Sequence, residues 1–115
     1  MASWVDKVSH LRAVLFEEGD AWSAQCLDYD VTAQAETLWE LPAELARVLT
    51  LHIAASVQMH REPFAGIPAA PLRFWELYEG GNRYEGKFPS FKIENGAELP
   101  SMMPDLRVAQ SPAAA

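Results

Sequence analysis

Several side chains with chemical potential lie in the first half of the chain. Cys26, Asp28 and Asp30 fall within the run "QCLDYD", and His52 follows further along. A thiol with a histidine base is the arrangement of a nucleophilic enzyme, and paired carboxylates can hold a divalent cation or share acid and base work. One hypothesis is therefore a small-molecule-binding protein or an enzyme that uses Cys26, Asp28 and His52.

The local context of these groups favours structural roles. Cys26 lies between Gln25 and Leu27, without the cationic neighbour or glycine turn that would lower a thiol pKa, and is predicted to be a small buried apolar residue. Asp28 and Asp30 are predicted to stabilise a bend between two strands, because aspartate hydrogen-bonds its own backbone in turns. No third ligand follows them at a defined spacing.

The histidines do not form a metal site by their spacing. His52 and His60 are eight residues apart, about two helical turns, which is too far to share one ion. His52 is predicted to be a hydrogen-bonded histidine at the edge of the core. The sequence also lacks a glycine-rich phosphate loop, a Ser-His-Asp pattern and a zinc spacing. We therefore expect neither catalysis nor a metal or other cofactor.

The composition indicates a single folded domain with an acidic surface. The chain has 115 residues, of which 50% are apolar, and this is enough for one core. The formal net charge is -7, and Lys and Arg do not cluster. Such a surface repels a phosphate backbone, so no nucleic-acid binding is expected of this chain alone. It suits a basic protein partner.

The compartment follows from the cysteine count and the apolar runs. One cysteine allows no internal disulfide, which fits a reducing environment. The N-terminal run "MASWVDKVSH" lacks the basic and then apolar pattern of a secretion signal, and no apolar run approaches the length of a membrane span. A cytoplasmic protein without membrane association is expected.

Alternating apolar residues predict three strands early in the chain. The runs "HLRAVLFEE", "AWSAQCLDY" and "DVTAQA" alternate as partly buried strands do. Gly19 and Asp20 suit a tight hairpin between the first two strands. Trp22, Ala24 and Cys26 then share one face of the second strand. The expected sheet is a small antiparallel one of three to four strands.

One long helix is predicted to follow, from Thr37 to about residue 61. The run Thr37-Leu38-Trp39-Glu40 has capping-box form, and Pro42 lies beyond the first helical position, where it should distort the first turn. Two apolar stripes predict a helix that packs on two sides. One side should cover the sheet, and the other should meet the C-terminal segment or a second copy of the chain. A self-assembling structural protein is therefore another hypothesis. The second stripe consists of Trp39, Ala43, Ala46, Ile53 and Val57.

Residues 63–115 are predicted to form a proline-rich extension that wraps the core of residues 1–62. "PLRFWELYEGG" predicts a short helix over about 71–79 with Leu72, Trp75 and Tyr78 on one face. Its aromatic residues could form a recognition patch, but their helical spacing favours docking onto the chain's own core. One short strand is expected in either "SFKIE" or "DLRVA", and the tail 111–115 is expected to be disordered.

The run "LRAVLFEEGDAWSAQCLDYDVTAQAETLWELPAELARVLTLHI" resembles the N-terminal domain of HicB-type antitoxins and their HicB-like relatives, over about Leu11 to Ser56. The shared pattern is a strand, a Gly/Asp hairpin, an aromatic-x-Ala-x-Cys strand, a short third strand and Thr-Leu at the start of the main helix. The resemblance implies an α+β fold of β-β-β-α-β order, a truncated ribonuclease-H-like layout with the helix on one face of the sheet.

The resemblance also implies a function. Members of that family bind a small basic ribonuclease toxin and block its active site. We therefore expect a non-enzymatic HicB-like interaction protein, either an antitoxin-type binder of such a toxin or an orphan of the family, that forms a homo-oligomer. The region after Pro63 lacks the helix-turn-helix and ribbon-helix-helix patterns with which many relatives bind DNA. The expected partner-binding residues are Asp20, Trp22, Asp28, Asp30, Trp75 and Tyr78.

Overall fold

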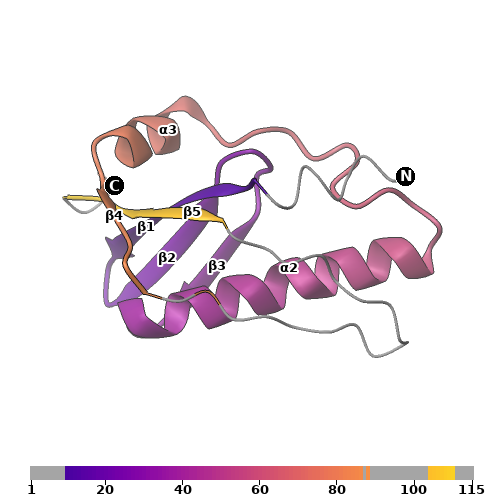
Figure 1. Cartoon of the computed structure of the whole chain (residues 1–115), viewed down its shortest axis with the longest axis horizontal. Helices are drawn as coiled ribbons and strands as arrows, with labels where there is room; N and C mark the ends of the chain where they lie inside the picture. The colour runs from indigo at the N-terminus through magenta and orange to yellow at the C-terminus, as the bar shows by residue number, and fades with distance from the viewer. Residues whose placement is uncertain (1–9, 87, 89–103, 111–115) are drawn as a thin grey trace.

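The computed structural model describes residues 10–86, 88 and 104–110. They form an α+β fold of three layers, in which the sheet lies between the long helix α2 and the short helix α3 (Figure 1). The helices are α2 (Leu41–Gln58) and α3 (Leu72–Glu79). The strands are β1 (Arg12–Glu18), β2 (Ala21–Cys26), β3 (Thr32–Ala35), β4 (Asn82–Arg83) and β5 (Asp105–Val108).

The sheet is larger than the sequence predicts, and its pairing is mixed. In the described part of the chain it has five strands in the order β3-β2-β1-β5-β4. The prediction of a purely antiparallel sheet of three to four strands was wrong, because β5 pairs with β1 in parallel. β1 is apolar on both faces, and such a strand belongs in the middle of a sheet with a neighbour on each side. β5 is the "DLRVA" alternative; "SFKIE" and the tail 111–115 lie outside the described residues.

The predicted hairpin is confirmed. Glu18 pairs with Ala21 at the end of the β1–β2 ladder, which leaves Gly19 and Asp20 as a two-residue loop. Gly19 has a φ of 64°, in the left-handed region that glycine adopts without a steric penalty. The second and third strands follow as expected, with β2 and β3 antiparallel.

The main helix begins and ends differently from the prediction. Leu38–Glu40 form a 3-10 turn (η1), and α2 begins at Leu41 and ends at Gln58. The Thr37 hydroxyl donates to Oε1 of Glu40 at 2.7 Å, but neither side chain caps a backbone N–H, so the capping box was wrong. Pro42 lies in the first turn of α2. The distorted helix start is confirmed, in the form of the 3-10 turn that precedes this proline.

The larger core lies between the sheet and α2. Ala13 and Leu15 of β1 are buried there together with Ala24 and Cys26 of β2. The helix contributes residues that recur at three and four positions, namely Leu41, Leu45, Leu49 and Ile53. The predicted second stripe is not a separate face, because Ala46 and Ile53 are buried whereas Trp39 is 76% exposed.

A second, smaller core lies between the sheet and α3. Val14 and Phe16, which point away from α2, pack with Phe74 and Tyr78. The Phe16 and Phe74 ring centroids are 5.7 Å apart. The predicted helix exists, and two residues of its predicted face pack on the core: Tyr78 is buried and Trp75 is partly buried. Leu72 was wrong, because it is 71% exposed. Phe74 is buried in its place, because its ring reaches the apolar second face of β1.

The junction between α3 and β4 gives a test of this packing. A Cβ at Gly81 would lie 2.8 Å from the Val108 carbonyl oxygen and 3.2 Å from that of Leu77. A Cβ at Gly80 would meet only the Glu76 carbonyl, at 3.7 Å. We expect Gly81→Ala to lower the free energy of unfolding by about 2 kcal/mol in urea denaturation, because backbone atoms must move. Gly80→Ala is the matched control and should be neutral or slightly stabilising. Equal effects of the two substitutions would contradict the close approach of β5.

Candidate functional site

The predicted partner-binding residues do not form one surface. Asp20 is exposed in the β1–β2 hairpin, and Trp22 is half-buried on the α2 side of the sheet. Asp28 and Asp30 lie around the bend between β2 and β3. Trp75 and Tyr78 belong to α3 on the other side of the sheet. These six residues therefore have different surroundings.

Asp28 and Trp75 belong to one structural cluster around Arg12. The Asp28 carboxylate accepts from the Arg12 backbone N–H at 2.8 Å and from its guanidinium at 2.7 Å. The hydrogen bond between the Asp28 carboxylate and the guanidinium raises the pKa of Arg12. The Arg12 guanidinium lies 4.5 Å from the centroid of the Trp75 ring, and the Trp75 indole N–H donates to the Ala70 carbonyl at 3.2 Å. Asp28 stabilises the bend as predicted, although through Arg12 and not through its own backbone.

Tyr78 is a packing residue and not an exposed binding residue. Its ring is buried in the second core, and its hydroxyl donates to the Asp105 carboxylate. Burial, and after it this hydrogen bond, raises the pKa of Tyr78 to about 12. The Arg107 guanidinium lies 4.3 Å from the ring centroid. Tyr78 thus connects α3 to β5. Its position agrees with the prediction that the aromatic residues of this helix dock on the chain's own core.

Cys26, Asp28 and His52 are not arranged as the enzyme hypothesis requires. Cys26 is 1% exposed, and burial raises the pKa of its thiol to about 11, so almost no thiolate exists at neutral pH. His52 Nε2 accepts from the Phe64 backbone N–H at 3.1 Å, and burial lowers the His52 pKa. The thiol contacts backbone N–H groups of the bend at residues 27–29, and no side-chain hydrogen bond joins Cys26 to His52 or to the Asp28 carboxylate. The buried cysteine and the hydrogen-bonded histidine are confirmed as predicted.

His52 also holds an unusual turn in place. Phe64 has a φ of 67°, a conformation that a bulky residue rarely adopts. Its ring stacks on His52 and on Tyr29, with 4.7 Å between ring centroids in both pairs. The contacts on the ring and on the N–H together offset the backbone strain. His52 therefore attaches the segment after α2 to the core.

A polar cleft of about 290 Å³ opens on the α3 side of the sheet, next to β3. It exists because α3 packs against β1 and leaves the β2–β3 half of this face without a helix. The strand residues that line it alternate along β1, β2 and β3 with residues that pack on the α2 side of the sheet. The polar cleft is lined by Phe16, Glu18, Ser23, Gln25, Asp30, Thr32, Gln34, Pro71, Arg73 and Phe74.

Hydrogen bonds order the floor of the polar cleft. The Ser23 hydroxyl donates to Glu18 Oε1 at 3.3 Å, and Gln34 Nε2 donates to the Ser23 hydroxyl at 3.3 Å and to Glu18 Oε1 at 3.4 Å. Gln25 Nε2 donates to the Cys26 carbonyl and to Asp30 Oδ1, both at 2.9 Å. Ser23 is only 4% exposed and Gln25 only 2%. The cleft thus combines two buried polar side chains, Ser23 and Gln25, with the exposed side chains of Glu18, Asp30 and Gln34 that they contact.

Of the predicted binding residues only Asp30 lines this cleft. Sequence reasoning missed its partners Glu18, Ser23, Gln25 and Gln34. The available signal was the alternation in "AWSAQCLDY" and "DVTAQA", which places Ser23, Gln25 and Gln34 on the face opposite Cys26. A polar face of an antiparallel sheet is ordinarily solvated. Only the folded structure shows that part of this one is buried.

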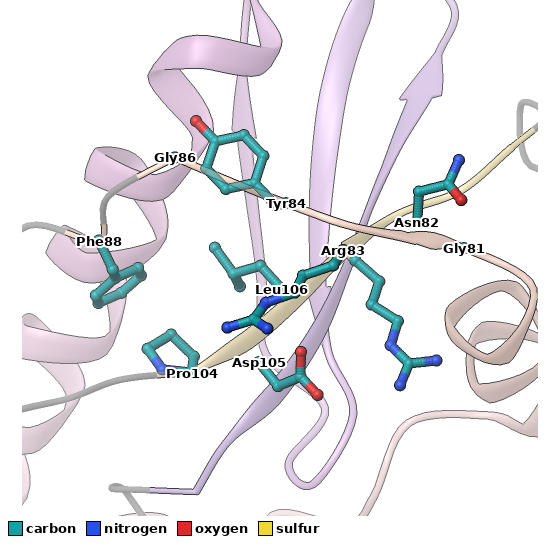
Figure 2. A pocket seen from close by; sticks show the side chains of 10 residues that line it. Gly81, Asn82, Arg83, Tyr84, Gly86, Phe88, Pro104, Asp105 and Leu106 are labelled. Atoms are coloured by element: carbon teal, nitrogen blue, oxygen red, sulfur yellow. The ribbon is translucent and has the colours of Figure 1, made fainter.

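A larger pocket of about 860 Å³ lies at the other edge of the sheet, beside β4 and β5 (Figure 2). Arg83 and Arg107 are opposite one another in the β4–β5 register, a like-charge pair that offers guanidinium groups to an anion. In Figure 2 the rings of Tyr84 and Phe88 lie on the side away from Asn82. No thiol, imidazole or serine hydroxyl is among its described lining residues.

Within residues 10–86, 88 and 104–110, no three His, Cys, Asp or Glu side chains group as metal ligands would. None of the helices found there has the length and apolarity that a membrane crossing requires. No protein-family model, curated protein or solved structure matches the chain.

The lowered pKa of His52 predicts a pH-dependent stability. The unfolded chain protonates this histidine near its ordinary pKa of 6.5, whereas the folded chain does so only at lower pH. The unfolded state therefore binds more protons below that value, so the free energy of unfolding is retained above about pH 6.5 and falls as the pH drops through it. We expect His52→Gln to flatten the pH profile of urea unfolding between about pH 7.5 and 5.

His10→Gln is the control for this experiment, because His10 lies at an exposed turn. Its profile should follow that of the parent protein. A His52→Gln profile parallel to the parent profile would show that His52 is as solvated in the folded state as in the unfolded one.

Proposed function

We propose that the protein is a non-enzymatic, HicB-like interaction protein that binds a small basic protein, such as a ribonuclease toxin. The resemblance over Leu11–Ser56 supports this class, and the order β1-β2-β3-α2 is the order that the resemblance implies. Because fold and function separate, the proposal rests on the surface and not on the fold alone. It applies equally to an antitoxin and to an orphan of that family.

The observation that carries the proposal is the charge beside β3. Glu17, Glu18 and Asp20 surround the β1–β2 hairpin, and Asp30 and Glu36 flank β3. All five are exposed, and none forms an ion pair with another described residue. We call these five residues the acidic edge. Their field would attract and orient a basic protein.

Strand β3 adds a structural reason for binding at the same place. Within the described part of the chain, β3 pairs with β2 alone, so the backbone groups on its outer side lack a ladder partner. An open strand edge accepts an added strand from a partner, with main-chain hydrogen bonds giving affinity. A basic partner that places a strand along β3 would satisfy these groups and neutralise the acidic edge together.

Self-assembly is the second candidate, and exposed apolar side chains favour it. Trp39 in η1 is 76% exposed, and Leu51 in α2 is 57% exposed. The exposed α2 surface also carries the ion pair between Glu44 and Arg47. Trp39 is three residues from Glu36 of the acidic edge, so a homo-oligomer through Trp39 would adjoin the surface proposed for the partner.

Charge reversal on the acidic edge tests the proposed function. The protein to be tested is any small basic protein that an adjoining reading frame encodes. It is co-expressed with the chain, and its binding is measured by calorimetry. We expect Asp20→Lys combined with Glu36→Lys to weaken its binding by at least about tenfold, because like charges would then meet at the interface.

The matched control is Glu76→Lys combined with Glu79→Lys, which reverses two exposed charges on α3. It should keep the affinity within about twofold. Equal losses in both variants would show that net charge, and not the acidic edge, drives binding. Absence of binding between the parent protein and such a partner would contradict the proposed function.

A further inference from the structure

The polar cleft contains unused hydrogen-bond acceptors and few unused donors. Each donor of Ser23, Gln25 and Gln34 is turned to a carboxylate, a backbone carbonyl or a hydroxyl inside the network. The orientation of both amides is dictated by chemistry, because only an NH₂ group can face the acceptor-only carboxylates of Glu18 and Asp30. The donors of Ser23, Gln25 and Gln34 are therefore used within the cleft, and the other side-chain donors of its lining belong to Thr32 and Arg73.

The acceptors left over come from the same side chains. Glu18 accepts through Oε1 and Asp30 through Oδ1, while their second oxygens accept from no other described residue. The Oε1 atoms of Gln25 and Gln34 likewise accept no hydrogen bond from described residues. Gln25 is 2% exposed, but its Oε1 is not a fully buried atom without a partner, so water or a ligand can reach it and donate to it. A molecule that fills the cleft must bring donors.

The charge of the cleft adds a second requirement. Its lining holds two carboxylates, Glu18 and Asp30, and one cation, Arg73. The Arg73 guanidinium lies 4.6 Å from the centroid of the Phe74 ring and so stays at the rim. The net charge of the lining is negative, which favours a donor that is also a cation.

The size and walls of the cleft restrict the cation further. About 290 Å³ is just below the range of roughly 300–1,000 Å³ that is typical of small-molecule sites, and it suits a single side chain. Phe16, Phe74 and Pro71 supply apolar walls, and the Phe74 ring already contacts Phe16 and the Arg73 guanidinium. A guanidinium is planar, always charged and rich in donors with no acceptor.

We infer that the polar cleft is a binding site for the guanidinium of an arginine that a protein partner presents. This inference rests on the proposed function and names the chemistry of its contact. Side chains of a strand added along β3 would point alternately to the two faces of the sheet. An arginine on the α3 side would then reach Glu18 and Asp30, the two residues of the acidic edge that line the cleft.

A peptide titration tests the site without the partner. The probe is N-acetyl-glycyl-arginyl-glycinamide, followed by NMR through the side-chain NH₂ signals of Gln25 and Gln34. We expect saturable shifts of both signals, with the lysyl peptide at least about threefold weaker because it makes fewer directed hydrogen bonds. The citrullyl peptide, which has the same shape without the charge, should not bind. Equal binding of all three peptides, or no shift with arginine, overturns the inference.

Variants locate the binding within the cleft. Asp30→Asn should lower the affinity for the arginyl peptide by about fivefold or more. Arg73→Gln should raise this affinity by about twofold, because the substitution removes the opposing cation. Glu79→Gln, on α3 and outside the cleft, is the matched control and should change nothing. Loss of binding in Glu79→Gln equal to that in Asp30→Asn would overturn the assignment to the cleft.

The partner separates this inference from the proposed function. If the basic protein binds and Asp30→Asn leaves its affinity unchanged, the guanidinium site is wrong and the proposed function stands. If the arginyl peptide binds in the cleft and no basic protein binds the acidic edge, the site stands and the proposed function is wrong.

Discussion

The burial of β1 on both faces is the constraint on which the rest of the structure depends. Ala13 and Leu15 face α2, whereas Val14 and Phe16 face α3, and all four are at most 3% exposed. Burying an apolar side chain of this size stabilises a fold by about 1.5–3 kcal/mol. A strand of this kind needs a neighbour on each side and a cover on each face. β2, β5, α2 and α3 supply these four neighbours.

The same constraint explains where the candidate site lies. α3 covers the β1 side of its sheet face and stops short of β3, so one half of the face is apolar and the other is polar. The connector before α3 is attached to the β2–β3 bend, where Asp30 N–H donates to the Pro68 carbonyl and Ala70 N–H to that of Leu27. These bonds bring Pro71 and Arg73 to the rim of the polar cleft. Stability and the proposed recognition thus use neighbouring halves of one surface.

Local patterns in the sequence predict much of this fold and little of its site. The hairpin at Gly19, the helix after Thr37 and the buried thiol of Cys26 each follow from a few adjacent residues. The parallel pairing of β5 with β1 does not, because it joins segments that are distant in the chain and leaves no turn signal between them. Alternation places Ser23, Gln25 and Gln34 on one face, but their burial depends on α3 and the connector, which approach from elsewhere in the sequence.

Residue-resolved amide hydrogen exchange tests the account most directly, because it reports both on β1 and on the edge of the sheet. The account predicts that amides of β1 paired to β2 or β5 exchange only by global unfolding, while the amides of β3 not bonded to β2 exchange orders of magnitude faster. Slow exchange of those outer β3 amides, equal to that of β1, would contradict it. The open edge would then be covered in the free protein, and the surface proposed for a partner would not exist.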